Sequence, residues 1–207
     1  FTSGTLIGAA HIGVFATIGL EKVTVFKRPI VGVMSTGDEL VQGSSQLKPG
    51  QIRDSNRHTI KALLEEMGAE IIDFGLIPDD EKAIESALLS ATEKCDAVVT
   101  SGGVSMGDFD YVKVVLDRLG EMKWMQVAIK PAKPLAFGLL NGVPIFGLPG
   151  NPVSAMVSFE LFMRPALLKM MGYKQVWRPY LRAKAVTPLK RRKDGKVHFA
   201  RVTLTRK

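Results

Sequence analysis

Four loops of this sequence combine charged or hydroxyl side chains with glycine or proline, and each follows a short apolar run. They span Ser35–Leu40, Ser101–Asp110, Lys130–Pro134 and Gly147–Ser154. These residue types suit an anionic ligand, because glycine lets backbone N–H groups approach oxyanions and lysine adds full positive charge. If the apolar runs are neighbouring parallel strands, at least the first, second and fourth loops converge on one edge of a sheet.

The second loop holds the most direct anion-binding pattern. Gly102 and Gly103 allow the backbone to come close to a ligand, and Ser101 and Ser105 add hydroxyl donors. A glycine pair after a strand is also common in tight turns, and that structural alternative stays open for this loop alone.

The third and fourth loops supply positive charge of two kinds. Lys130 and Lys133 are separated and followed by prolines, which stiffen the loop. Asn151 is a typical N-cap and Pro152 a typical first helical residue, so a helix start would direct its partial positive charge at the ligand. Read alone, the lysine pattern is more often that of a solvated loop.

The carboxylates in these loops would repel an anion unless a cation lies between them. Asp38, Glu39, Asp108 and Asp110 are oxygen ligands of the kind that Mg²⁺ prefers. We therefore expect Mg²⁺ between carboxylates and phosphate oxygens. The alternative for Thr36–Glu39 is a plain helix cap.

The elements that must position these loops alternate between strand and helix patterns, which predicts an α/β fold with a mostly parallel sheet and helices on both faces. The expected strands are Ile30–Met34, Glu70–Leu76, Ala97–Ser101, Met122–Ile129, Leu135–Leu140 and Val143–Leu148. The expected helices are Arg57–Met67, Asp79–Glu93, Tyr111–Leu119 and Pro152–Met171. A further helix is expected over residues 5–19, and alternating stretches at Leu181–Val186 and Val197–Leu204 suggest the start of a small β domain.

The formal net charge of +8 belongs mainly to the end of the sequence. The segment Lys174–Lys207 holds twelve Lys or Arg and a single acid, Asp194. Its Asp-Gly dipeptide predicts a basic hairpin over Lys190–Lys196, facing solvent or a partner, which we favour over a nucleic-acid surface. We expect no nucleic-acid partner.

Cysteine and histidine, which often indicate nucleophilic catalysis or metal binding, are few in this sequence. Cys95 is the single cysteine, which agrees with a reducing cytosol, and we interpret it as a packing residue. His11, His58 and His198 lack a metal-ligand partner at helical spacing and are interpreted as structural or surface residues. No apolar run approaches the roughly 20 residues that span a bilayer, so we expect a cytoplasmic protein without a membrane segment.

Taken together, the four loops resemble the molybdopterin-binding domain of the MoeA/gephyrin family of molybdopterin molybdotransferases. The resemblance covers about Pro29–Gly172 and keeps the family order of the loops. It implies three parts: residues 1–28 as the end of a preceding helical region, residues 29–175 as the molybdopterin-binding domain, and residues 176–207 as the start of a C-terminal β-barrel domain. The chain begins at Phe1 rather than Met, which suggests a fragment.

The resemblance also implies an activity: molybdate is inserted into adenylylated molybdopterin with release of AMP, and Mg²⁺ assists. Catalysis and metal binding would fall to Glu39, Asp108 and Asp110. Substrate binding would fall to Thr36, Ser101, Gly102, Gly103, Ser105, Lys130, Lys133, Asn151, Pro152 and Ser154. The family implies a homodimer in the full-length protein and suggests the adenylyltransferase of the same pathway as a partner.

One departure and two rival functions accompany this resemblance. Ala132 stands where the family pattern Lys-Pro-Gly-Lys-Pro has glycine, and we expect a backbone conformation there that both residues tolerate. A molybdopterin adenylyltransferase of the same fold shares the Ser-Gly-Gly and Gly-Asp-Glu loops, but the flanking segments favour the molybdotransferase. The other rival is a scaffold that retains the fold to cluster partner proteins.

Overall fold

The computed structural model describes residues 1–103, 111–190 and 193–205 and is built around one six-stranded sheet. The strand order is β4-β1-β5-β9-β8-β6. These strands are β1 (Ile30–Thr36), β4 (Glu70–Ile77), β5 (Ala97–Ser101), β6 (Glu121–Gln126), β8 (Pro134–Leu140) and β9 (Val143–Leu148). The first four in the order run parallel, while β8 is antiparallel to both of its neighbours.

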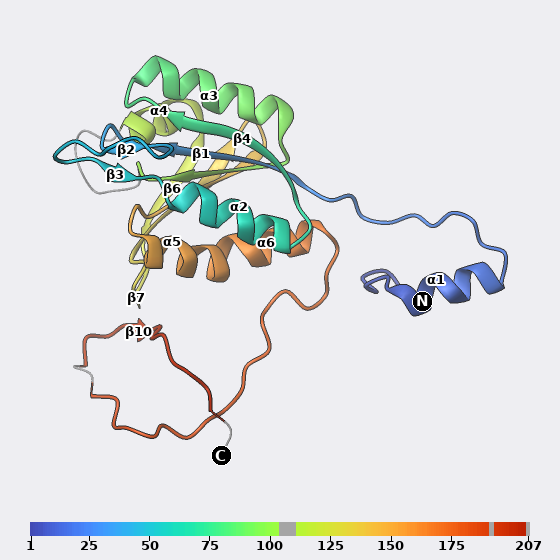
Figure 1. The fold of residues 1–207 in the computed structure, drawn as a ribbon. Coiled ribbons are helices and arrows are strands. Elements are labelled where there is room, and N and C mark those ends of the chain that lie inside the picture. The colour runs from blue at the N-terminus through green and yellow to red at the C-terminus, as the bar shows by residue number, and fades with distance from the viewer. Residues whose placement is uncertain (104–110, 191–192, 206–207) are drawn as a thin grey trace.

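Helices cover both faces of the sheet, as Figure 1 shows. On one face lie α2 (Asn56–Glu66) and a long helical run made of α5 (Pro152–Ser158), a π-helical turn at Phe159–Met163 and α6 (Arg164–Met170). On the other lie α3 (Glu81–Lys94) and α4 (Tyr111–Leu119). The predicted α/β class with a mostly parallel sheet is therefore confirmed.

The central strands are apolar on both faces because each face is packed under helices. Val31 and Val33 of β1 contact the cluster that includes Leu64 and Phe159. Met34 of β1 belongs to the opposite cluster, with Leu88 of α3. Continuous apolar runs are what a doubly covered parallel strand requires, and this explains why these strands were recognised from the sequence.

The strand β8 and its outer neighbour β6, which forms the edge of the sheet, give the sheet its mixed character. Because β8 is antiparallel to both β9 and β6, strand β6 runs in the same direction as β9. The connection between β6 and β8 therefore lies at the edge where the parallel strands end. This connection contains β7 (Ile129–Lys130) and the lysine loop.

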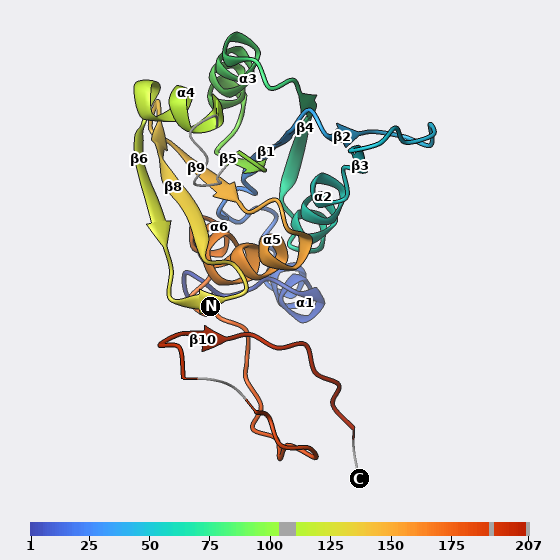
Figure 2. The same cartoon turned by 90° about the vertical axis from the view of Figure 1, so that its left-hand side faces the viewer.

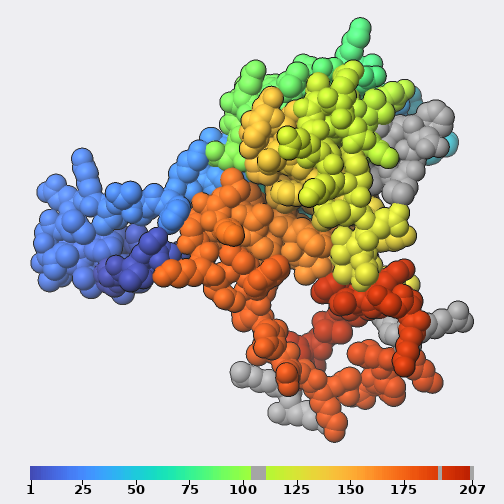
Figure 3. All heavy atoms as spheres, turned by 180° about the vertical axis from the view of Figure 1, so that it is seen from behind, coloured from blue at the N-terminus to red at the C-terminus, as the bar shows by residue number. Residues whose placement is uncertain are grey.

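The two ends of the chain extend from this body (Figures 1 and 3). The predicted N-terminal helix is present as α1 (Ala9–Thr17), but none of its residues is buried. The Leu181–Val186 stretch does not form the expected strand, and both of these named side chains are more than 80% exposed. An alternating pattern forms a strand only when a neighbouring strand accepts its hydrogen bonds, and the described structure offers it none.

The basic segment contacts the body at one short strand and through Arg178, whose guanidinium pairs with Glu160 of the π-helical turn at 2.6 Å. The strand β10 (Val197–His198) pairs in parallel with β7, and the N–H of Phe199 donates to the carbonyl of Lys130 at 2.8 Å. Asp194 and Gly195 form the expected turn, in which the Lys196 N–H donates to the Asp194 carboxylate at 3.2 Å. The described residues before this turn form no strand, so the expected hairpin is wrong as a paired element.

Candidate functional site

The loops after β1, β5 and β9 meet at one edge of the sheet, at the left of Figure 1 and toward the centre of Figure 2. Ser101, the last residue of β5, lies in register with Ser35 of β1 and Leu148 of β9. Beyond the strands, the N–H of Gly102 still donates to the carbonyl of Leu148 at 3.2 Å. The predicted convergence of the first, second and fourth loops is confirmed.

The glycine pair allows two of these loops to touch. Gly102 has φ +90°, and a Cβ atom there would lie 2.6 Å from the carbonyl oxygen of Thr36. Gly103 also has positive φ, at +67°. Any side chain at Gly102 would separate the β5 loop from the end of β1, where Thr36 is itself only 4% exposed.

The acidic part of the edge follows β1 and its outer neighbour β4. The segment at Asp38 and Glu39 forms a turn into the short strand β2 (Leu40–Val41), which pairs with β3 (Ile52–Arg53). No helix follows Glu39, so the helix-cap interpretation is wrong.

Asp79 is a carboxylate at this edge that the sequence analysis missed as a site residue. The N–H of Asp38 donates to the Asp79 carboxylate at 3.1 Å, and the N–H of Asp79 donates back to Asp38 at 3.4 Å. Burial raises the pKa of Asp79, and the negative charges of Asp38 and Glu39 raise it further. Its position after a parallel strand was a usable signal, although the sequence pattern predicts it as the first residue of the helix Asp79–Glu93.

A polar turn at the start of α2 lies beneath the edge and was also missed. Arg57 is 1% exposed, and its guanidinium donates to Asp54 at 2.8 Å and to Asp73 at 2.6 Å. Asp54 also accepts a hydrogen bond from the hydroxyl of Ser35 at 3.1 Å. A basic residue such as Arg57 in the first turn of a helix is unfavourable beside the helix dipole. Its presence there was the signal in the sequence that Arg57 has a specific acidic partner.

The lysine loop carries both expected cations on its surface. Lys130 and Lys133 are exposed, and the carbonyl of Lys133 accepts from the N–H of Val127 at 2.7 Å. Between them Ala132 is 2% exposed and has φ +74°. The expectation of a conformation tolerated by alanine is therefore wrong: this is a left-handed position, where a Cβ atom costs about 1–2 kcal/mol.

The start of α5 confirms the predicted cap. Asn151 is the N-cap, Pro152 is the first helical residue, and the Asn151 side chain accepts from the N–H groups of Val153 and Ser154 at 3.1 and 3.2 Å. The next N–H, of Ala155, donates to the backbone carbonyl of Asn151. The first-turn N–H groups thus have partners already, so binding of an oxyanion by this turn stays a prediction and requires Asn151 to share them.

Three predicted site residues, Ser105, Asp108 and Asp110, lie outside the described residues. Within the part of the chain that the structure describes, no group of three His, Cys, Asp or Glu side chains is arranged to hold a metal ion. The structure therefore places Glu39 at the edge, while the complete metal-ligand set stays a prediction.

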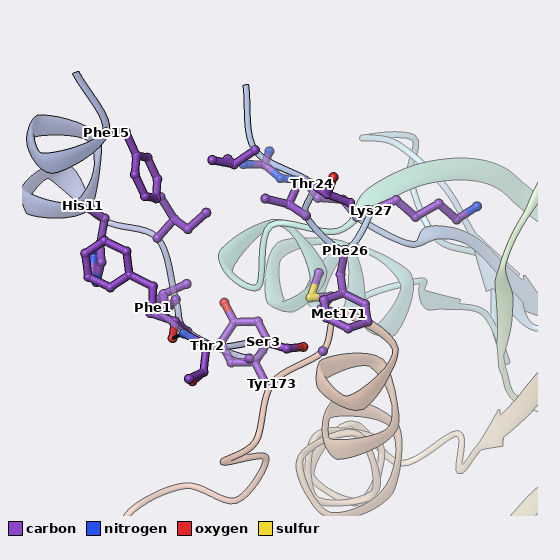
Figure 4. Close-up of a pocket in the computed structure, with 18 of the residues that line it drawn as sticks. Phe1, Thr2, Ser3, His11, Phe15, Thr24, Phe26, Lys27, Met171 and Tyr173 are labelled. Carbon is purple, nitrogen blue, oxygen red and sulfur yellow. Dashed lines mark hydrogen bonds between the residues drawn. The ribbon is translucent and has the colours of Figure 1, made fainter. Parts of the chain in front are cut away.

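A large pocket lies elsewhere. It has a volume of about 1020 Å³ and lies between the N-terminal segment and the ends of α2 and α6, where Phe1, Phe15, Phe26 and Tyr173 line it (Figure 4). This is the opposite end of the sheet from the converging loops (Figure 1). None of the predicted site residues that the structure describes lines it.

The cysteine and the histidines lie away from the converging loops or on the surface. Cys95 is buried, and burial raises the pKa of its thiol, which agrees with a packing role. His198 lies 2.9 Å from the Asp194 carboxylate, and His58 is exposed on α2. In the described residues no helix is long and apolar enough to cross a membrane.

Comparisons with known proteins agree with this arrangement. A family model described as a probable molybdopterin binding domain matches residues 32–169. The chain belongs to this family. The chain is 43% identical to the molybdopterin molybdenumtransferase of Haemophilus influenzae over 96% of this chain and 49% of that protein. It is also 37% identical to gephyrin of Dictyostelium discoideum, over 82% of this chain and 28% of that protein.

Solved structures give the same result for the molybdopterin-binding domain. The molybdopterin biosynthesis MoeA protein of Pyrococcus horikoshii superimposes with a TM-score of 0.73 at 37% identity, over 84% of this chain and 43% of that one. The MoaB protein of Thermus thermophilus, at 20% identity and a TM-score of 0.54, shares the fold alone. The expected resemblance to the MoeA/gephyrin family is confirmed. The chain spans about half the length or less of the curated relatives named above.

Proposed function

We propose that this chain is the substrate-binding part of a molybdopterin molybdenumtransferase, which joins molybdate to adenylylated molybdopterin and releases AMP. The observation that carries the proposal is the convergence of the β1, β5 and β9 loops at one sheet edge. The names of the relatives support it, and the likeness to MoaB, at 20% identity, gives no comparable support to an adenylyltransferase.

The edge divides into regions with different chemistry. In this proposal Thr36, Ser101, Gly102, Gly103 and Ser105 hold the phosphate or pterin end of the substrate. Lys130, Lys133, Asn151, Pro152 and Ser154 surround molybdate and the dithiolene end. Positive charge near molybdate is required because a small dianion offers no apolar surface, and charge-assisted hydrogen bonds must hold it.

The acidic region fits a divalent cation. Asp38 and Glu39 are hard oxygen ligands. Burial, and then the negative charges of these two residues, raise the pKa of the neighbouring Asp79, and a bound cation would offset that repulsion. We propose that Glu39, Asp108 and Asp110 hold Mg²⁺ and serve hydrolysis of the adenylyl phosphate. When bound, Mg²⁺ would neutralise charge on the phosphate oxygens.

Assembly and location belong to the same proposal. We propose a homodimer in the full-length protein, a cytoplasmic location, and transfer of substrate from the adenylyltransferase that produces it. These rest on the family resemblance alone.

The test is AMP release by the full-length protein, measured with and without molybdate. We expect release from adenylylated molybdopterin only when molybdate is present, and a higher half-saturating molybdate concentration in Lys130→Ala and Lys133→Ala. A lost charge-assisted hydrogen bond of about 1.5–3 kcal/mol corresponds to roughly 10- to 150-fold. Lys123→Ala, an exposed lysine on the edge strand β6, is the matched control. Unchanged half-saturation in both loop variants would remove the lysines from the molybdate site.

A further inference from the structure

Asn56, the first residue of α2, connects two of the proposed substrate loops. Its side-chain amide nitrogen donates to the hydroxyl oxygen of Ser101 at 2.9 Å and to the carbonyl oxygen of Gly150 at 2.8 Å. Ser101 ends β5, and Gly150 lies in the loop after β9. Asn56 is 8% exposed and Ser101 is 3% exposed, so water competes little for these bonds.

The loop after β1 is fixed by the same turn. Asp54 accepts from the hydroxyl of Ser35 on β1 and, two residues before Asn56, also accepts from the N–H of Arg57 at 3.2 Å. The turn from Asp54 to Arg57 therefore contacts the ends of three neighbouring parallel strands. The ion pairs of the buried Arg57 with Asp54 and Asp73 hold this turn in place, and so they fix the position of Asn56.

The direction of these hydrogen bonds has a chemical consequence. A carboxamide NH₂ group has two donors, and here both are used, one for each loop. Because the Ser101 oxygen accepts from Asn56, its own O–H hydrogen is left to donate, and no other partner for it lies among the described residues. A hydroxyl oriented in this way is a donor for an anion.

We propose that Asn56 is a positioning residue that fixes Ser101 as a hydrogen-bond donor to the phosphate or pterin end of the substrate and holds the Gly150 turn against it. This inference rests on the proposed function, since it assigns an anionic ligand to Ser101. Asn56 itself does not contact the substrate and acts through Ser101.

The decisive variant is Asn56→Asp in the full-length protein. The carboxylate has the same shape but only accepts, so it would take the Ser101 hydrogen for itself and repel the Gly150 carbonyl. We expect the KM for adenylylated molybdopterin to rise on the order of tenfold or more, because a hydrogen bond to a charged group is lost. The half-saturating molybdate concentration should change less than about threefold. Simple destabilisation would reduce the amount of active protein and leave KM unchanged.

A double-mutant cycle separates action through Ser101 from direct charge repulsion. Ser101→Ala should raise KM by a similar factor, and the double variant should be no worse than either single one. If the two effects multiply instead, Asn56 does not act through Ser101 and the inference is overturned. His58→Ala, an exposed position on the same helix, is the matched control and should match wild type.

Hydrogen–deuterium exchange gives a readout that does not depend on activity. In Asn56→Asp, backbone exchange should rise in the peptides that contain residues 101–103 and 148–151, and stay unchanged in α3. If that variant fails to fold, Asn56→Ser, which keeps one donor and adds no charge, is measured in the same way. A wild-type protein that releases no AMP would refute the proposed function, whereas unchanged KM and exchange in a folded Asn56 variant would refute this inference alone.

Discussion

Arg57 pairs with both Asp54 and Asp73, and it is the only buried cation among the described residues that does so. Replacing Arg57 by methionine removes this cation. The two ends of this network differ. The Asp54 side chain is 1% exposed, while the Asp73 side chain is 28% exposed and keeps Lys61 at 2.6 Å. Breaking a buried pair from one side costs about 3–5 kcal/mol. Because Asp54 retains hydrogen bonds from Ser35 and from a backbone N–H, we expect the lower end, about 3 kcal/mol.

Urea unfolding at pH 7 measures this free energy. In Arg57→Met the Asp54 side chain, which is 1% exposed, has no cation beside it. The free energy of unfolding should therefore fall by about 3 kcal/mol relative to wild type. Arg118→Met is the control, because Arg118 forms ion pairs on the surface, where a pair contributes about 0–1 kcal/mol. A loss below about 1 kcal/mol would show that the buried charge does not hold the turn.

Three further changes probe separate parts of the molecule. Hydrogen bonds from Lys61 and Arg57 outweigh the effect of burial and lower the pKa of Asp73 to about 2. The ionised Asp73 therefore contributes about 2 kcal/mol to the stability of the fold above pH 3.8, and this contribution is lost as the pH falls toward 2. Asp73→Asn should flatten the urea midpoint across that window, and an unchanged slope would contradict the assignment. Ala132→Gly should raise stability by up to about 1 kcal/mol, measured as a higher urea midpoint, because relief of a left-handed alanine exceeds the added chain entropy; a lower midpoint would disprove the strain. Asp110→Ala in the full-length protein should abolish Mg²⁺-dependent AMP release without changing the circular dichroism spectrum, and wild-type release would remove Asp110 from catalysis.

The central sheet was predictable because its signal is continuous burial. Strands β5 and β9 were bounded correctly from the sequence, and α4 was as well. Apolar runs of four to seven residues between helical patterns leave few alternatives in a doubly covered sheet. The C-terminal segment was less predictable, since the Leu181–Val186 pattern specifies which side chains would face a core but not whether a neighbouring strand exists.

Site residues could be predicted from the sequence where the residue type itself suits the ligand. They could not be predicted where the role depends on a contact with another residue. Gly102, Lys130 and Asn151 could be assigned because their types suit an anion and they follow strands. Asn56 and Arg57 could not, because their roles depend on Ser101, Gly150 and Asp73, which lie between 16 and 94 residues away in sequence.

The Ala132 result shows how backbone geometry and sequence can disagree at such an edge. The family pattern has glycine there, and the structure gives that position the left-handed φ of +74° that glycine adopts freely. The conformation persists with alanine because the loop is fixed on both sides: Ala132 is buried, the Lys133 carbonyl accepts from Val127, and the Lys130 carbonyl accepts from Phe199. These bonds set the direction in which the loop leaves β7 and enters β8, and with it the placement of both lysines. An alanine at this position therefore lowers stability while keeping the lysines on the edge where the parallel strands end, which is the arrangement that the proposed molybdate site requires.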